Sequence, residues 1–340
     1  MKIMTVLGEI APENLGTTLA HEHLIIDVSC RRRMTDDPHL QRIAEEPVSM
    51  SILGDLRRNP TISADSLRLN DADLAIKELA YYKELGGRSL MDHTSRWIGG
   101  RPLELRRISQ AVGVQIVAGC GYYSPALPES LNELSVEELK ERLVGEVERG
   151  VDGTDVRPGF IGEIGTSWPL TPLEEKTLRA AARAQVETGL GLSIHPSPWD
   201  KSAHTLLDIV ESEGADLRRV IICHLDHVID VPYHAAIAKR GAYIEYDRFG
   251  VEWYSSQETL RFFPRDTERV VALRTLIEQG FLEHILLSQD VCQKIELREF
   301  GGHGYSHILR YVVPMMKKMG VAEEQVQTMM VENPKRFLSH

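Results

Sequence analysis

Two histidines, His21 and His23, lie two residues apart in the apolar stretch 18–27 of this chain. The stretch is typical of a β-strand, and alternate residues of a strand point to the same side, so both imidazoles face one way while Glu22 faces the other. Neutral imidazole is the commonest metal-binding side chain, and the pair offers half of a coordination shell. On an edge strand the same residues would be surface histidines, and this pattern alone leaves both interpretations open.

Further residues that could bind a metal or move a proton end short apolar runs elsewhere in the chain. They are Glu163, His195, His224, Asp247 and Asp290. Each alone has a common structural explanation, as a hydrogen-bonded histidine or a capping carboxylate. Together, four imidazoles and three carboxylates in apolar surroundings would be costly to bury without partners that compensate for the lost hydration, so they are difficult to explain as independent accidents. Nitrogen and oxygen donors without thiolates suit zinc, manganese, cobalt or iron.

The stretches between these residues predict a regular alternation of helices and strands. After residue 70, amphipathic stretches with helical periodicity alternate with short apolar runs. We expect strands at 89–92, 114–118, 159–164, 192–195, 220–224, 242–246 and 285–289. With the strand at 18–27 they make eight β-α units, which predict a closed (β/α)8 TIM barrel of the α/β class. The C-terminal ends of barrel strands meet at one mouth, so the polar residues would share one site.

The rest of the chain is expected to extend this barrel. We predict a single domain over residues 1–340, with a short N-terminal hairpin at 4–19 that turns near 12–14. Extra C-terminal helices are expected at 306–319 and 322–338. A doubly wound open sheet is the alternative fold. Against it, the chain lacks the glycine-rich phosphate-binding motifs that are usual in such sheets.

Composition and charge limit the class of partner. The formal net charge of −11 argues against non-specific binding to nucleic acid or to an anionic membrane. The N-terminal apolar run is too short for a secretory signal, and no stretch approaches the length of a transmembrane helix. The cysteines are widely spread, without a C-x-x-C pair, at Cys30, Cys120, Cys223 and Cys292. We therefore expect a cytoplasmic protein that acts on a small molecule.

The order of these motifs resembles a known family. The His-x-His pair is followed by Gly-Glu-Ile-Gly at 162–165 and by single histidines at two later strand ends. Tyr-Asp-Arg-Phe-Gly at 246–250, Ser-Gln-Asp at 288–290 and a glycine-rich stretch at 301–307 follow. Over essentially the whole chain this order is similar to the phosphotriesterase-related branch of the amidohydrolase superfamily, in particular to its phosphotriesterase homology proteins.

The resemblance implies a barrel with a binuclear metal centre. By position, the ligands would be His21, His23 and Asp290 for the more buried metal, His195 and His224 for the more exposed one, and Glu163 as the bridge. Two divalent ions are expected, with zinc first and manganese, cobalt or iron as alternatives. Many members carry a carbamylated lysine as the bridge. A glutamate is shorter and bridges without carbon dioxide, which leaves metal spacing and metal identity open.

The implied chemistry is hydrolysis. A hydroxide shared by two divalent metals is a nucleophile at neutral pH, and Asp290 is the expected proton acceptor. The first hypothesis is a metal-dependent hydrolase of a carboxylic ester, lactone or amide, and a phosphotriesterase is the alternative. A non-catalytic binding protein on the same barrel is the third hypothesis. The complete ligand set argues against this third hypothesis, because a site without turnover has no physical need for all six ligands.

Two residues outside the ligand set are candidates for substrate contact. Tyr123 matches the position where lactonase-like relatives place a substrate-contacting aromatic residue, and a half-buried structural aromatic is the alternative. Arg248 would either bind an anionic group of the substrate or pair with a loop carboxylate. Specificity is expected in the loops at 29–70, which includes one short helix near 49–57, at 248–265 and at 291–304. Relatives suggest a homodimer.

Overall fold

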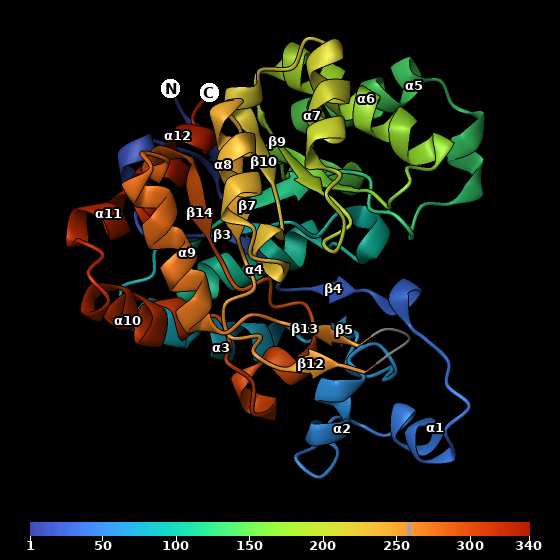
Figure 1. Ribbon diagram of the computed structural model, residues 1–340. Coiled ribbons are helices and arrows are strands. Elements are labelled where there is room, and N and C mark those ends of the chain that lie inside the picture. The colour runs from blue at the N-terminus through green and yellow to red at the C-terminus, as the bar shows by residue number, and fades with distance from the viewer. Residues whose placement is uncertain (257–259) are drawn as a thin grey trace.

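A barrel of parallel strands lies at the centre of the computed structural model, which describes residues 1–256 and 260–340 (Figure 1). The sheet order is β14-β11-β10-β9-β8-β7-β6-β3, so neighbouring strands also follow one another along the chain. The strands are β3 (Thr18–Glu22), β6 (Ser89–Asp92), β7 (Gln115–Cys120), β8 (Phe160–Gly165), β9 (Gly191–His195), β10 (Val220–Ile222), β11 (Tyr243–Tyr246) and β14 (Ile285–Leu287). The Asp290 amide, just after β14, donates to the His21 carbonyl of β3 at 3.1 Å and closes the barrel. The predicted (β/α)8 barrel is confirmed.

The strands are apolar on both faces because both faces are buried. β10 reads Val-Ile-Ile and β14 reads Ile-Leu-Leu, and all of these residues are buried. At the N-terminal end of the barrel, Phe160 and Phe337 belong to one apolar cluster. The Phe337 ring packs so closely on Gly191, the first residue of β9, that a Cβ there would lie 2.3 Å from the ring. Polar side chains therefore gather at the opposite end, the mouth.

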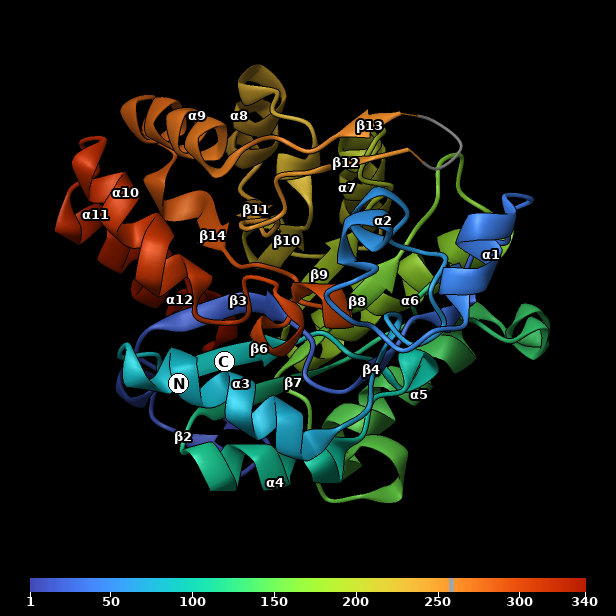
Figure 2. The same ribbon diagram turned by 90° about the horizontal axis from the view of Figure 1, so that it is seen from below.

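Helices surround the barrel (Figure 2). They are α3 (Ala72–Glu84), α4 (Pro102–Val112), α5 (Val136–Arg149), α6 (Pro172–Thr188), α7 (Ala203–Ser212), α8 (Val231–Lys239) and α9 (Asp266–Glu278). Local signals set their ends: Ser135 and Thr171 begin α5 and α6 with capping boxes, and Gly113 ends α4 in the left-handed conformation. The C-terminal helices are α10 (Val313–Lys318), α11 (Glu323–Gln327) and α12 (Asn333–Leu338), with π-helical segments at Ile308–Val312 and Thr328–Glu332.

The N-terminal hairpin is present, but its turn lies earlier than predicted. β1 (Ile3–Thr5) pairs with β2 (Gly8–Ile10), so the chain reverses at residues 6 and 7, and Pro12–Asn14 forms a single 3-10 turn instead. Gly8 adopts a φ of 112°, a conformation that residues with a side chain rarely adopt. The Thr5 hydroxyl donates a hydrogen bond of 2.8 Å to the Gly8 carbonyl. The threonine and glycine, rather than the later proline, therefore fix the turn.

The stretch 29–70 folds over the mouth as a small lobe with its own core. β4 (Ile26–Asp27) and β5 (Arg68–Leu69) pair antiparallel at its base, and it contains α1 (Pro38–Ala44) and α2 (Leu53–Arg58). The single helix predicted near 49–57 is therefore incomplete, because Asp37 caps a second one. The core of the lobe contains Ile43, Val48, Ile52, Leu53, Leu56 and Ile62.

A two-stranded ribbon of β12 (Tyr254–Ser255) and β13 (Arg261–Phe262) lies beside α2 at the same end of the barrel (Figure 1 and Figure 2). The Arg58 guanidinium lies 4.0 Å from the Tyr254 ring centroid and links the ribbon to the lobe. In the described part of the chain, no helix is both long enough and apolar enough to cross a membrane. The lobe and the ribbon both border the entrance to the barrel.

Candidate metal centre

Six side chains from five strands converge at the mouth of the barrel. His21 lies on β3 and His23 directly follows it, Glu163 lies on β8, and His195 ends β9. His224 and Asp290 follow β10 and β14 within three residues. The structure therefore brings together all six residues that the sequence singled out as metal ligands.

One side of this group is formed by His21, His23 and Asp290. The His23 Nε2 atom lies 3.3 Å from Asp290 Oδ1, and the His21 Nε2 atom lies 3.9 Å from the same oxygen. His21 Nε2 is also 3.6 Å from Glu163 Oε1. These separations are too long for strong hydrogen bonds and match the spacing of donors around a common centre.

The other side is formed by His195 and His224. The His224 Nε2 atom lies 2.7 Å from His195 Nδ1 and 3.4 Å from Glu163 Oε1, and His195 Nδ1 contacts the same Glu163 oxygen. Two sets of three donors can therefore be drawn, His21 with His23 and Glu163, and Glu163 with His195 and His224. Glu163 belongs to both, which is the geometry of a bridging carboxylate.

The second nitrogen of three of these imidazoles is already occupied. His21 Nδ1 lies 3.0 Å from Glu245 Oε2, His23 Nδ1 lies 2.9 Å from Thr94 Oγ1, and His224 Nδ1 lies 3.0 Å from Asp247 Oδ1. This leaves each Nε2 directed into the group, and the buried His21 Nε2 has no hydrogen-bond partner. A ligand imidazole whose other nitrogen is held by a carboxylate or hydroxyl is typical of metal-binding histidines. The donor set therefore fits a pair of divalent cations.

Burial and charge favour the metal-binding protonation state of His21, Glu163 and Asp290, whereas neighbouring carboxylates outweigh burial and raise the pKa of His23 and His224. Burial lowers the pKa of His21 well below its usual range, so its imidazole is neutral. Burial alone would raise the pKa of Glu163, but the His195 imidazole holds the pKa of this carboxyl well below its usual range. In the same way, burial would raise the pKa of Asp290, but the Arg248 guanidinium, together with the neighbouring histidines, holds it well below its usual range.

Two of the six residues have a backbone conformation that no sequence pattern predicted. His224 and Asp290 have φ values of 58° and 49°, in the left-handed region that side chains rarely adopt. Hydrogen bonds hold both: the His224 amide donates to Asp247 Oδ2 at 2.9 Å, and the Asp290 amide pairs with β3. Such outliers concentrate at functional sites, where surrounding structure compensates for the strain.

Arg248 lies at this site without facing the open mouth. Its Nη1 atom donates to the Asp290 carbonyl at 2.9 Å and to Asp290 Oδ2 at 2.6 Å, and its Nη2 atom donates to Glu296 Oε1 at 2.9 Å. The residue is buried. From the sequence, Arg248 would either bind an anionic group of the substrate or pair with a loop carboxylate, and this geometry corresponds to the second interpretation. Glu296 and Glu245 escaped the sequence analysis because neither lies in a recognisable motif.

Tyr123 lies between the candidate ligands and the entrance. Its ring centroid is 5.2 Å from that of His195, and its hydroxyl accepts a hydrogen bond of 3.2 Å from Arg31 Nη1. A small cavity over the ligands is lined by Tyr123 and Arg31 together with His23, Glu163, His195 and Asp290. Arg31 was not identified from the sequence, since an Arg-Arg-Arg run in a polar loop usually indicates a solvated surface.

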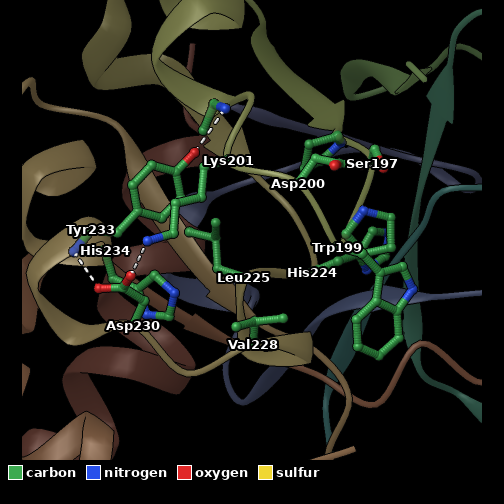
Figure 3. Close-up of a pocket in the computed structure, with 13 residues that line it drawn as sticks. Ser197, Trp199, Asp200, Lys201, His224, Leu225, Val228, Asp230, Tyr233 and His234 are labelled. Atoms are coloured by element: carbon green, nitrogen blue, oxygen red, sulfur yellow. Dashed lines mark hydrogen bonds and ion pairs between the residues drawn. The ribbon is translucent and has the colours of Figure 1, made fainter. Parts of the chain in front are cut away.

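A separate, narrow pocket lies beside His224 (Figure 3). Trp199 and Leu225 line the end nearest His224, and Tyr233 lies at the other end. The cation of this pocket, Lys201, is paired with Asp230. The pocket therefore offers apolar walls, and its lysine is already paired, while a second carboxylate, Asp200, also lines it.

The chain matches known proteins over nearly its whole length. Residues 1–338 match the model of the "Phosphotriesterase family". An N-acetyltaurine hydrolase from Danio rerio is 37% identical over 342 residues, covering 99% of this chain and 98% of the relative.

Two solved structures have the same fold over nearly the whole chain. A resiniferatoxin-binding protein from Rhodobacter sphaeroides superposes with a TM-score of 0.97 at 43% identity, covering 99% of this chain and 95% of that one. A lactonase from Listeria monocytogenes superposes with a TM-score of 0.80 at 27% identity, covering 100% of this chain and 99% of that one.

Proposed function

Because this chain belongs to the phosphotriesterase family, we propose that it is a binuclear metal-dependent hydrolase that cleaves a carboxylic amide, ester or lactone. The observation that carries the proposal is the pair of donor triads sharing Glu163. Relatives named as an N-acetyltaurine hydrolase and a lactonase support acyl chemistry, and the amide is our first choice because the hydrolase matches the chain from end to end.

The proposed ligands are His21, His23 and Asp290 on one side, His195 and His224 on the other, and Glu163 between them. Two divalent ions bound there, zinc in our proposal, would supply a Lewis acid for the substrate carbonyl and lower the pKa of a water molecule. The low pKa of Glu163 keeps this carboxylate ionised through the neutral range. The ligand group is therefore ready for cations without losing protons from its carboxyls.

Asp290 is proposed to receive the proton of the attacking water. One of its oxygens, Oδ2, is held by Arg248, and the other, Oδ1, faces His23 and His21. The fixed oxygen orients the carboxylate, so the second oxygen presents a lone pair toward the reacting centre. Arg248 is therefore proposed as a positioning residue for Asp290 rather than a group that binds substrate.

Tyr123 is proposed to contact the substrate. The residue is buried, and its edge lies against His195 beside the cavity over the ligands. Its hydroxyl already accepts a hydrogen bond from Arg31, so the phenol proton is directed elsewhere and can donate to an acyl oxygen.

Metal removal and restoration test this proposal. The purified protein is treated with a chelator and dialysed, and bound metal is measured before and after zinc, manganese or cobalt is restored. Each preparation is assayed with N-acetylated amines, lactones, aryl esters and a paraoxon-type triester. We expect about two metal ions per chain, loss of turnover on chelation and its recovery with metal, with acyl substrates preferred.

Three outcomes would contradict the proposal. Turnover that persists without metal would exclude metal-dependent hydrolysis. Preference for the triester would favour the phosphotriesterase alternative. Metal and ligand binding without turnover of any substrate would favour a binding protein, as the name of the Rhodobacter structure describes that relative.

A further inference from the structure

The seam of the barrel, where the first strand β3 meets the last strand β14, carries three of the six candidate metal ligands. The sheet order begins at β14 and ends at β3, and the backbone hydrogen bond from the Asp290 amide to the His21 carbonyl joins the two ends. His21 and His23 lie on one side of this seam, and Asp290 lies on the other. The geometry of these ligands therefore depends on what fixes β3 and the segment after β14 relative to each other.

Glu22 lies between the two histidines in the sequence and reaches across this seam. Its Oε1 atom accepts hydrogen bonds from the Ser288 hydroxyl at 2.8 Å, the Gln289 amide at 3.0 Å and the Gln289 side-chain Nε2 at 2.9 Å. Its Oε2 atom accepts a hydrogen bond of 2.9 Å from the Val291 amide. Glu22, Ser288 and Gln289 are fully buried, so water does not compete for these bonds.

The two amides that flank Asp290 therefore converge on one carboxylate. The Gln289 amide donates to Glu22 Oε1 and the Val291 amide donates to Oε2. Asp290 between them has a φ of 49°. Successive amides around a left-handed residue form a concave anion-binding nest, and here the anion is the Glu22 side chain. The left-handed conformation of Asp290 is thus compensated by this carboxylate.

Glu22 also acts on the backbone of His21, on the other side of the seam. The Ser288 hydroxyl, which donates to Glu22, accepts a hydrogen bond of 2.9 Å from the His21 amide. The Gln289 side-chain oxygen accepts a hydrogen bond of 2.9 Å from the Ile308 amide, so the same network reaches the first π-helical segment. A single carboxylate thus connects the backbone of one candidate ligand with that of another.

The chemistry of this position requires a carboxylate. In the described part of the chain, all four hydrogen bonds of the Glu22 side chain are accepted from donors. An ionised carboxylate has only acceptor atoms, whereas a glutamine amide would direct an N–H group at one of these donors. Arg248 holds the side chain of Asp290 through Oδ2. The two buried groups therefore have separate tasks, because Glu22 fixes the Asp290 backbone and Arg248 fixes its carboxylate.

We propose that Glu22 is a positioning residue for Asp290, and that its carboxylate fills the nest of amides at 289 and 291 and so sets where the Asp290 carboxylate lies relative to His21 and His23. The catalytic consequence rests on the proposed hydrolysis, in which Asp290 receives a proton. A displacement of about 1 Å at a reacting group can lower a rate by about 100-fold. Glu22 is not among the described residues that line the cavity over the ligands, so the effect is expected on kcat rather than on KM.

The test compares Glu22→Gln with the wild type, as metal-free protein and as holoenzyme loaded with zinc or cobalt. In the metal-free protein, hydrogen exchange at the amides of Gln289 and Val291 should be at least about tenfold faster in the variant. Metal titration and the cobalt absorption spectrum report the ligand geometry, and we expect an affinity about 10- to 100-fold lower and a changed spectrum. With saturating metal, kcat should fall by about 100-fold and KM should change by less than about threefold.

The matched control is Glu78→Gln. Glu78, on α3, is a buried glutamate whose oxygens accept the backbone amides of Arg298 at 3.1 Å and Glu299 at 2.8 Å, and neither residue is a candidate ligand. This variant should speed exchange at 298 and 299, while the cobalt spectrum stays unchanged and kcat changes by less than about threefold. Equal losses of kcat in Glu22→Gln and Glu78→Gln would overturn the proposal, because they would come from general loosening of the segment after β14.

A second variant keeps the test decisive if Glu22→Gln does not fold. Glu22→Asp has an acceptor-only side chain that is one methylene shorter, so exchange at Gln289 and Val291 should again be faster and kcat about tenfold below that of the wild type. Faster exchange in Glu22→Asp with an unchanged cobalt spectrum and unchanged kcat would overturn the proposal, since the carboxylate would then close the barrel without positioning Asp290.

The exchange and spectroscopic measurements separate this proposal from the hydrolase assignment. Faster exchange and a changed cobalt spectrum in Glu22→Gln, with no turnover of any substrate by the wild type, would refute the hydrolysis and leave the positioning role standing. Turnover by the wild type, with a kcat and a cobalt spectrum that Glu22→Gln leaves unchanged, would refute the positioning role and leave the hydrolysis standing.

Discussion

The two sides of the candidate metal centre are built differently. On the inner side, which His21, His23 and Asp290 form, Arg248 donates hydrogen bonds to both Asp290 and Glu296. The other oxygen of Glu296 accepts a hydrogen bond from the Cys292 amide at 2.8 Å. On the outer side, His195 and Arg31 face cavities that open toward solvent. The difference lies in these fixed partners and not in exposure, because the side chains of Asp290 and His195 are each 12% exposed. We therefore expect the inner side, with its fixed ion pairs, to support the proposed chemistry and the less constrained outer side to select the substrate.

The comparison predicts that the inner side controls kcat. Asp290→Asn keeps the shape of the side chain and an oxygen for Arg248, but it removes the proposed proton acceptor and a ligand charge. We expect kcat to fall by about 10³-fold or more with the fold intact. Steady-state kinetics, metal analysis and circular dichroism check this together. A loss below tenfold with metal content unchanged would remove Asp290 from the proposed mechanism.

The two arginines of the mouth provide the sharpest contrast. Removing the buried Arg248 leaves Asp290 and Glu296 without their shared cation, and breaking such a buried pair costs about 3–5 kcal/mol. We therefore expect Arg248→Gln to lower both the free energy of unfolding and kcat. Arg31→Gln should change stability by less than about 1 kcal/mol and act on KM. Urea unfolding and kinetics of both variants make the comparison, and similar stability losses in both would show that the two sides do not differ.

The ligands at the strand ends could be predicted from the sequence, whereas the residues around the entrance could not. His21, His23, Glu163, His195 and the fold around them were accessible because strand ends of a barrel meet at one mouth, and this depends only on local periodicity. Arg31 was not accessible, because its place over the ligands depends on how the lobe 29–70 folds. The helix α1 of that lobe and the early turn at Gly8 were not predicted for a related reason. A single cap at Asp37 begins the helix, and a positive φ angle at Gly8 sets the turn.

The smallest expected effect is the loss of stability at acid pH that comes from one buried histidine. His234, on α8, is buried with its Nδ1 atom 2.8 Å from the Tyr246 hydroxyl, and burial lowers its pKa to about 4. The folded state therefore binds this proton less readily than the unfolded chain, where the pKa is about 6.5. Its contribution to stability is complete above pH 6.5 and is lost as the pH falls toward 4. It amounts to about 2 kcal/mol between pH 8 and pH 5.

His234→Gln keeps a donor and an acceptor without a group that titrates, so the variant should lose about 2 kcal/mol less than the wild type over this pH range. Urea unfolding of both proteins at pH 8 and pH 5, with the same saturating metal, measures the difference. Protonation of the metal ligands affects both proteins equally and cancels. Parallel losses in the two proteins would mean that the folded protein tolerates the charged imidazole of His234, and that burial of this residue does not contribute to the pH dependence of stability.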